Sequence, residues 1–343
     1  MIKAIAVAAT EHRACELQVQ KELDFMNKGI LGIHHITAMS GIAQENIDFY
    51  VGVLGLRLVK KTVNFDAPDV YHFYYGDTVG NPGTILTFFP FGEGPRGRSG
   101  AGQATVTSFS IRPESIAFWI QRLQDHGLSV SGPQARSHDR QVITFYDPDG
   151  LALELVAHQG AEKRPGWQDG PVPSEHAIRG FYSVTIKVKN HVLTSALLKD
   201  VMGFRLIEQN GCRFRYEVGE GGPGTMIDVI SQEDAAYGRQ SIGTIHHIAW
   251  RVANEEELVW WQQKLLNVGL HATEVKDRNY FKSVYFREPG GVLFELATDP
   301  PGFAIDESVE NLGSSLKLPE WLEPTRSNLE AQLPPISVPK IRG

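Results

Sequence analysis

The chain has 343 residues, which suggests about two domains at roughly 150 residues each. Apolar residues make up 42% and charged residues 21%, an ordinary globular composition, and the net charge of −7 argues against a nucleic-acid or anionic-membrane surface. No apolar run approaches the roughly 18 residues that cross a bilayer, and the run from Ala4 to Ala9 is short for a signal peptide. Cys15 and Cys212 lie far apart and outside any C-x-x-C motif, so we expect free thiols in a cytoplasmic protein.

The predicted elements begin after an N-terminal extension, residues 1–29, which matches nothing else in the chain. Met26 stands just before the first strand, so we expect either a mobile extension or a natural start near that methionine. An apolar strand at 33–39 and a helix at 45–54 follow, and then about three strands separated by Gly, Pro or Asp. This succession predicts a βαβββ module.

The chain repeats this module. The paired segments are 53–61 with 201–209, 119–130 with 261–272, and 146–155 with 287–296. In the last pair, YDPDGLALEL matches REPGGVLFEL at an offset of 141 residues. Repeats at a fixed spacing decide the architecture, so the chain contains four modules.

We therefore predict an α+β fold in which four βαβββ modules pair into two curved mixed sheets, with the inward strand faces lining a cleft. The first pair of modules occupies 30–160 and the second pair occupies 178–299. The last module opens with a strand at 245–252 and a helix at 255–268. The Pro-rich tail, 300–343, carries one short helix at 324–332 and is expected to pack on the modules.

Two histidine pairs occupy the same place in their modules, on the first strand. They are His34-His35 in GIHHIT and His246-His247 in TIHHIA, and Glu295 lies on the last strand of the fourth module. Successive strand residues face opposite sides, so one histidine of each pair can point into a given cleft. Two imidazoles and a carboxylate form a facial triad that suits non-haem Fe(II), although Zn²⁺ or Mn²⁺ could take the same ligands.

The other two modules act as an internal control. In the third module, Tyr182 and Ser183 stand where the first has His34 and His35. In the second module, Thr105 and Val106 stand where the fourth has His246 and His247, and Glu154 stands where it has Glu295. Only the carboxylate is retained there, and it cannot hold a metal alone. We therefore expect one complete site, a vestigial second cleft, and a structural role for Glu154.

Arg278 and Tyr285 lie near Glu295 in sequence, where the second module has Ser137 and Thr144. A guanidinium beside a metal-bound oxygen would stabilise anionic character there. A phenol can donate a hydrogen bond or relay a proton. Because the second module lacks both side chains at these positions, we favour a functional role for each. The alternatives are a surface charge for Arg278 and strand packing for Tyr285.

These motifs resemble the vicinal oxygen chelate superfamily, which includes glyoxalases and extradiol dioxygenases, and within it the bacterial hydroquinone-type ring-cleaving dioxygenases. The resemblance covers roughly residues 31–335. The matching phrases are GIHHITAMSG, NIDFYVGVLGLRLVKKTVNFD, YHFYYGD, GTILTFFPF, IHHIAW, DRNYF, GGVLFEL and LPEWLEP.

The resemblance implies that His35, His247 and Glu295 are the metal ligands. It also implies supporting roles around the metal for His34, Thr37, His246, Arg278 and Tyr285. Strand alternation places His34 and His246 on the face opposite the ligands, so their roles require a bulge, a twist or a neighbouring module.

The implied activity is that of an Fe(II)-dependent dioxygenase that inserts both atoms of O₂ into a hydroquinone-type or catechol-type diol. Mn(II) is the alternative metal for the same site. The expected partners are a small aromatic diol and O₂, with no nucleic acid and no membrane, and a homo-oligomer stays open. One alternative is a glyoxalase-type metal-dependent lyase or isomerase that consumes no O₂. Another is a non-catalytic protein of the same fold that sequesters a small molecule.

Overall fold

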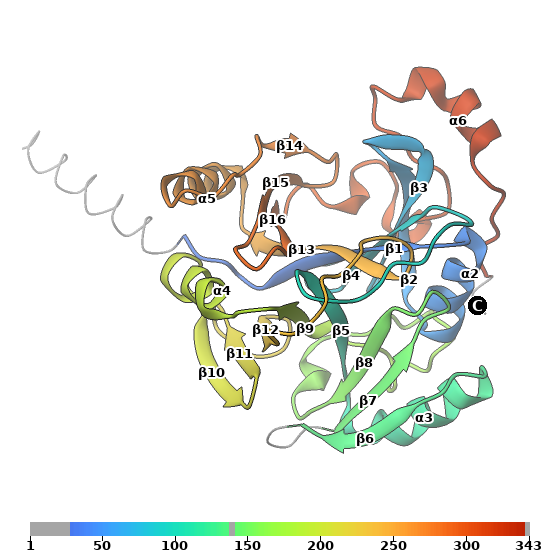
Figure 1. The fold of residues 1–343 in the computed structure, drawn as a ribbon. Coiled ribbons are helices and arrows are strands. Elements are labelled where there is room, and N and C mark those ends of the chain that lie inside the picture. Colours follow the sequence, from blue (N-terminus) through green and yellow to red (C-terminus); the bar gives the residue numbers. More distant parts are fainter. Residues whose placement is uncertain (1–27, 137–140, 340–343) are drawn as a thin grey trace, which may run out of the picture.

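The structure is a computed structural model that describes residues 28–136 and 141–339 (Figure 1). The expectations for the N-terminal extension, with Cys15 and Met26, fall outside the described residues. Ser137, the expected counterpart of Arg278, also lies outside them.

Four βαβββ modules follow one another, as predicted. The first consists of β1 (Ile33–Ser40), α2 (Ala43–Ile47), β2 (Arg57–Asn64), β3 (Ala67–Gly76) and β4 (Ile85–Pro90). Its helix is shorter than predicted, because the chain passes at Asp48 into a π-helical turn, η1 (Asp48–Val53). The second consists of β5 (Gln103–Ile111), α3 (Ile116–Asp125), β6 (Ser131–Ala135), β7 (Gln141–Tyr146) and β8 (Ala152–Ala157).

The second half of the chain repeats this order. The third module consists of β9 (Phe181–Val188), α4 (Val192–Ala196) with the π-helical turn η4 (Leu197–Val201), β10 (Arg205–Asn210), β11 (Arg213–Glu217) and β12 (Met226–Ser231). The fourth consists of β13 (Thr244–Val252), α5 (Glu255–Asn267), β14 (Lys276–Asp277), β15 (Lys282–Arg287) and β16 (Leu293–Thr298).

The strands form two curved mixed sheets of eight strands each, which confirms the predicted fold class. One sheet has the order β14-β15-β16-β13-β1-β4-β3-β2, and the other β10-β11-β12-β9-β5-β8-β7-β6. Each sheet therefore joins one module from each half of the chain, through the antiparallel pairs β1–β13 and β5–β9. The pairs 30–160 and 178–299 divide the sequence, whereas the sheets pair the first module with the fourth and the second with the third.

The helices α3 and α5 pack on the hydrophobic core through residues that belong to the repeated segments. Trp119 on α3 and Trp261 on α5 open the matching segments, and both are buried in the same core as Leu123 and Leu265. The spacing of four residues places each Trp and Leu on one helix face. The helices are thus anchored by the residues that made the repeat recognisable.

The tail lies against the first module, with α6 (Arg326–Gln332) near β3 in Figure 1. Lys60 of β2 is fully buried, and its Nζ lies 2.5 Å from Asp306 Oδ1 and 2.6 Å from Glu307 Oε2. Trp321 packs edge-on against Phe65. Within the described residues, no helix is long and apolar enough to traverse a bilayer.

Candidate metal centre

Three neighbouring strands at the middle of the first sheet supply the candidate ligands. His35 comes from β1, His247 from β13 and Glu295 from β16, and these strands are adjacent in the order β16-β13-β1. Ala249 pairs with His35 on one side and with Glu295 on the other. Because its side chain is a single methyl group, the longer side chains of its two neighbours can meet above it.

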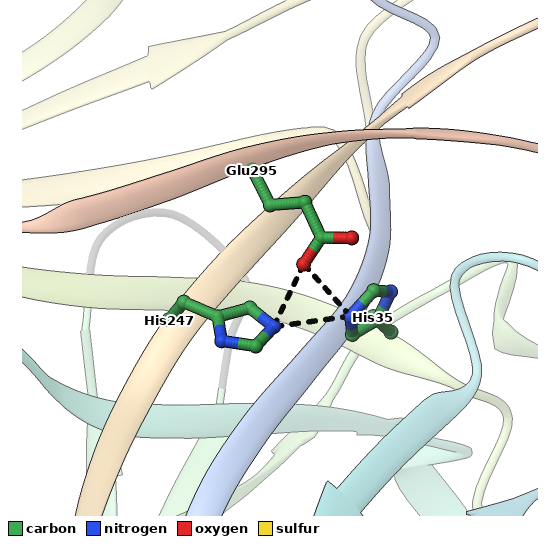
Figure 2. Close-up of side chains that lie close together, drawn as sticks. All are labelled: His35, His247 and Glu295. Carbon is green, nitrogen blue, oxygen red and sulfur yellow. Dashed lines mark hydrogen bonds and ion pairs between the residues drawn. The ribbon is translucent and has the colours of Figure 1, made fainter. Parts of the chain in front are cut away.

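The three side chains converge on one point (Figure 2). His247 Nε2 lies 2.8 Å from Glu295 Oε2, His35 Nε2 lies 3.3 Å from the same oxygen, and the two Nε2 atoms lie 3.2 Å apart. Ligands at about 2.1 Å from an octahedral ion, at right angles to one another, are about 3.0 Å apart. The triangle therefore has the size of three cis metal ligands.

The chemistry of this cluster also calls for a cation. Glu295 is fully buried, and its Oε2 faces the Nε2 atoms of the two histidines, whereas its Oε1 accepts a hydrogen bond from Ser283 Oγ. Burial alone would raise the pKa of Glu295, but the adjacent His35 and His247 hold it well below its usual value. A buried carboxylate is costly unless a positive charge compensates it, and a divalent ion would do so.

His34 sits in a β-bulge that turns it toward His35. The pairing of β1 with β13 shifts register between Ile33 and His35, so His34 is the extra residue. His34 Nε2 lies 3.1 Å from the carbonyl oxygen of Thr298, which can only accept, so this nitrogen carries a proton. Burial, with His35 beside it, lowers the pKa of His34 to about 3, so the ring is neutral and its Nδ1 is an acceptor.

That acceptor fixes the tautomer of His35. The two Nδ1 atoms lie 2.9 Å apart, so His35 must donate from Nδ1, which leaves its Nε2 as a bare lone pair facing the cluster. Fixing a ligand through its second ring nitrogen is a common arrangement in metal sites. His34 itself does not line the central cavity.

His246 occupies the matching place on β13. The register shifts again between the pairs Thr37–His247 and Ala38–Ile245, so His246 is also the extra residue of a bulge. Its Nδ1 lies 2.7 Å from His247 Nδ1, and burial together with His247 lowers its pKa to about 3. Unlike His34, this ring lines the cavity.

Arg278 and Tyr285 lie together beside the triad. Arg278 Nε donates to Tyr285 Oη at 3.2 Å and its Nη2 donates to Asp66 at 3.0 Å, while the Tyr285 ring packs edge-on against His247. Burial and the nearby Glu295 raise the pKa of Tyr285, so the phenol keeps its proton. Burial alone would lower the pKa of Arg278, but Tyr285 and Asp66 raise it, so the guanidinium stays charged.

A cavity of about 210 Å³ opens in front of the triad. Besides the residues already discussed, its wall contains side chains that were not predicted as site residues. These are Met39, Asn64, Phe65, Asp66, His72, Tyr74, Phe89, Phe91 and Phe281. All nine lie within the motif phrases. The alternation on β3, which places His72 and Tyr74 on one face, could have identified two of them from the sequence.

His72 links the cavity wall to Thr37. Tyr74 Oη lies 2.9 Å from His72 Nδ1, His72 Nε2 lies 2.9 Å from Thr87 Oγ1, and Thr87 donates to Thr37 Oγ1 at 2.8 Å. The arrangement uses both ring nitrogens, and burial lowers the pKa of His72 well below its usual value. His72 is therefore a neutral, fixed part of the wall.

The second sheet holds no equivalent triad among the described residues. Glu154 is buried there, accepts from Ser108 Oγ at 2.7 Å, and forms a bidentate pair with Arg136 at 2.7 and 2.6 Å. A guanidinium thus takes the place that a cation would fill next to Glu295. The sequence offset missed Arg136 by one residue, because Ala135 pairs with Gln141 whereas Asp277 pairs with Lys282, so the connection is one residue longer in the second module.

Comparison with known proteins places this chain in a family. A family model described as the Glyoxalase/Bleomycin resistance protein/Dioxygenase superfamily matches residues 32–155 and 184–296. The chain is 44% identical over 313 residues to the "Putative ring-cleaving dioxygenase MhqO" of Bacillus subtilis (strain 168), which covers 91% of this chain and 99% of that protein. It is 36% identical over 306 residues to the "Chlorohydroquinone/hydroquinone 1,2-dioxygenase" of Sphingobium indicum, covering 87% and 94%.

A solved structure agrees with these matches. The crystal structure of a "putative dioxygenase" from Bacillus subtilis subsp. subtilis str. 168 has a TM-score of 0.86 and 43% identity, and covers 91% of this chain and 99% of that one. The chain belongs to the glyoxalase/bleomycin resistance protein/dioxygenase superfamily. Within it, the resemblance to ring-cleaving dioxygenases that the motifs indicated is confirmed.

Proposed function

We propose that this protein is an Fe(II)-dependent dioxygenase that opens the ring of a hydroquinone-type diol and inserts both atoms of O₂. The observation that carries the proposal is the buried triangle of His35, His247 and Glu295, with an aromatic-walled cavity on its open side. The names of the relatives support the reaction class, and one of them names chlorohydroquinone and hydroquinone. Mn(II) suits the same ligands, and a catechol-type diol is the second substrate class.

The ligand set accounts for the choice of chemistry. Two neutral imidazoles and one carboxylate on one face leave three adjacent positions for the diol and O₂. When bound, Fe(II) would supply the electron transfer that allows a closed-shell ring to react with O₂. The chain keeps the ligands ready for it, because His34 and Ser283 fix the orientation of His35 and Glu295.

Arg278, Tyr285 and His246 would act on the substrate oxygens. A positive guanidinium and a protonated phenol beside the triad favour an ionised diol oxygen there. If His247 donates from Nδ1 to His246, then His246, which lines the cavity, carries its proton on Nε2 and can donate a hydrogen bond to a substrate oxygen. His34, which does not line the cavity, would act only by holding His35.

The cavity suits a single aromatic ring. Its volume of about 210 Å³ is small, and Phe65, Phe89, Phe91 and Phe281 contribute flat apolar walls. Tyr285 and His246 contact His247, and Arg278 contacts Tyr285, so these polar groups lie beside the triad. A ring can therefore stack between the aromatic walls while its oxygen reaches the ligands.

A glyoxalase-type lyase usually has a second carboxylate or amide ligand, which also serves as the catalytic base. Among the described residues lining the cavity, Asp66 is the carboxylate, and Arg278 already holds it. The sequestering alternative gives no reason to bury Glu295 with one oxygen turned toward two imidazoles. We therefore favour the dioxygenase, acting in the cytoplasm on a small aromatic diol and O₂.

An oxygen-electrode assay tests this proposal. Protein loaded with Fe(II) under reducing conditions is given a panel of hydroquinones and catechols. We expect O₂ uptake matched one-to-one with loss of a hydroquinone, abolished by a chelator and restored by Fe(II). Turnover that proceeds equally well without O₂ would favour the lyase instead, and binding without turnover across the panel would favour sequestration.

A further inference from the structure

The second sheet has a cavity of its own, about 330 Å³ in volume. Its lining is unlike the aromatic wall of the first. The lining residues are Arg136, Glu208, Asn210, Cys212, Arg213, Arg215 and Ile230. Three guanidiniums therefore meet at one hollow of the vestigial cleft.

Strand register shows that this hollow is the counterpart of the substrate cavity. Tyr74 pairs with Thr87 in the first sheet, and Arg215 pairs with Asp228 in the second. Thr87 pairs in turn with Thr37 on the first strand of its module, as Asp228 pairs with Thr185 on the first strand of the third. Position by position, Arg213 replaces His72, Arg215 replaces Tyr74, Asp228 replaces Thr87 and Ile230 replaces Phe89. The place of the substrate ring is retained, and its walls have become cationic.

The arginines are only partly used by the protein itself. Asp228 accepts from Arg215 Nε at 2.6 Å and Nη2 at 2.5 Å, and from Arg213 Nη1 at 2.8 Å. Arg136 is taken up by Glu154. Arg215 is 4% exposed, and its Nη1 has no hydrogen-bond partner among the residues that the structure describes. Two N–H donors of a buried guanidinium thus lack an acceptor, which is costly unless something in the cavity supplies one.

The charges limit what that acceptor can be. Arg213 and Arg215 share the one carboxylate of Asp228, whereas Arg136 is paired with Glu154, so the Arg213–Arg215 pair has two guanidiniums for one carboxylate. Glu208, half-buried in the wall, is a third carboxylate at this hollow, and it would repel a ligand that carries two negative charges. A ligand with one negative charge and planar oxygens matches a guanidinium edge better than a dianion does.

We propose that the cleft of the second sheet binds a small monocarboxylate, held by Arg215 and Arg213. This second site is independent of the metal centre. Its ligand occupies the position, relative to the repeat, that the diol occupies in the first sheet. The two halves of the fold would thus hold two ligands of different chemistry.

Calorimetric titration of the metal-loaded full chain with benzoate tests the proposal, with benzamide as an uncharged probe of the same shape. We expect saturable benzoate binding with a dissociation constant of about 1 mM or tighter, and no comparable binding of benzamide. Inorganic phosphate is expected to bind more weakly than benzoate. Failure of benzoate to bind, equal binding of benzamide, or tighter binding of phosphate would each overturn the assignment.

Variants locate the site. Arg213→Gln, which is partly exposed and safer to change, and Arg215→Gln should each weaken benzoate binding by at least about tenfold, since each removes a charged donor. Arg205→Gln removes a positive charge from the same sheet outside the cavity and should bind as the unchanged protein does. Unaltered binding in Arg213→Gln when that protein is folded, or equal loss in Arg205→Gln, would contradict the proposal. The comparison of Arg213→Gln with Arg205→Gln tests the proposal even if Arg215→Gln does not fold.

Discussion

Each histidine pair divides two tasks between neighbouring residues. His35 and His247 face the cluster, while His34 and His246, turned by bulges, approach the Nδ1 atoms of their neighbours. For the first pair, the carbonyl of Thr298 sets the proton position of His34 and, through it, that of His35. The candidate metal ligand His35 is thus oriented by a backbone carbonyl through the ring of His34.

Replacing the two equivalent carboxylates tests this division at the level of single residues. Glu295→Gln should strip or greatly weaken iron binding, because a neutral amide replaces an anionic ligand. Glu154→Gln is its matched control, because Arg136 and Ser108 hold that carboxylate. It should leave iron content and turnover nearly intact at some cost in stability. Metal analysis under identical loading compares them, and equal loss of iron would contradict a single metal site.

Arg278→Ala should keep the metal and lower turnover by about 10²–10³, the usual loss for one preorganised donor at developing negative charge. Arg278 does not ligate, so iron content should not change, although Tyr285 and Asp66 each lose a partner. Arg96→Ala, an exposed arginine, is the control for loss of charge. Near-normal turnover in Arg278→Ala would reduce the residue to a structural partner of Asp66.

At the scale of elements, the repeat also shows in the turns that join the last two strands of a module. Asp147 Oδ1 accepts from the backbone N–H groups of Asp149 and Leu151, and its Oδ2 accepts from Tyr50 Oη. Glu288 does the same between β15 and β16, where it accepts from the N–H groups of Gly290 and Val292. Both turns are held by a buried carboxylate, and burial raises the pKa of each.

Asp147 should make stability depend on pH in a defined direction. Burial raises its pKa from 3.8 to about 6, so the folded protein binds the proton more tightly than the unfolded chain. Its contribution to the free energy of unfolding, on the order of 3 kcal/mol, is fully present below about pH 4 and is lost as the pH rises through about 6. Asp147→Asn should remove this slope in urea unfolding, and the exposed Asp69→Asn should not. An unchanged slope in Asp147→Asn would rule out this source.

Elements and their order were readable from the sequence, and some of their irregularities were not. Apolar alternation and the helical Trp and Leu positions located the modules. Strand alternation indicated that His34 and His246 need a bulge or another irregularity to reach the site, but it did not predict where a bulge lies. The position of an extra residue depends on how β1 and β13 align across the sheet. A straight sequence offset pointed to Ser137, whereas Arg136 pairs with Glu154, because the connection from Ala135 to Gln141 is one residue longer than the connection from Asp277 to Lys282.

At the scale of the whole molecule, the site exists because the first and fourth modules share a sheet. The histidine pairs alone indicated that those two modules are neighbours, since no other module carries such a pair. The cavity wall, however, also takes Asn64, Phe65 and Asp66 from the end of β2 and the turn that follows. No repeat or metal motif marks those residues, since their place depends on how the edge of the curved sheet closes over the cleft.

The tail stabilises that edge through a buried ion pair. Lys60→Met would leave Asp306 and Glu307 without their buried partner, and we expect a loss of about 3–5 kcal/mol in the free energy of unfolding. Lys61→Met, at the next position of β2 and only half-buried, should cost about 1 kcal/mol or less. Chemical denaturation measures both. Equal effects would mean that the tail does not depend on this contact.

Labelling with ¹⁸O₂ tests the central claim most directly. Protein loaded with Fe(II) is given hydroquinone under labelled oxygen, and the ring-opened product is examined by mass spectrometry. Ring cleavage at His35, His247 and Glu295 predicts two label atoms in each product molecule, and no product from Glu295→Gln. A product that carries no label, or that forms at the same rate without oxygen, would contradict the account.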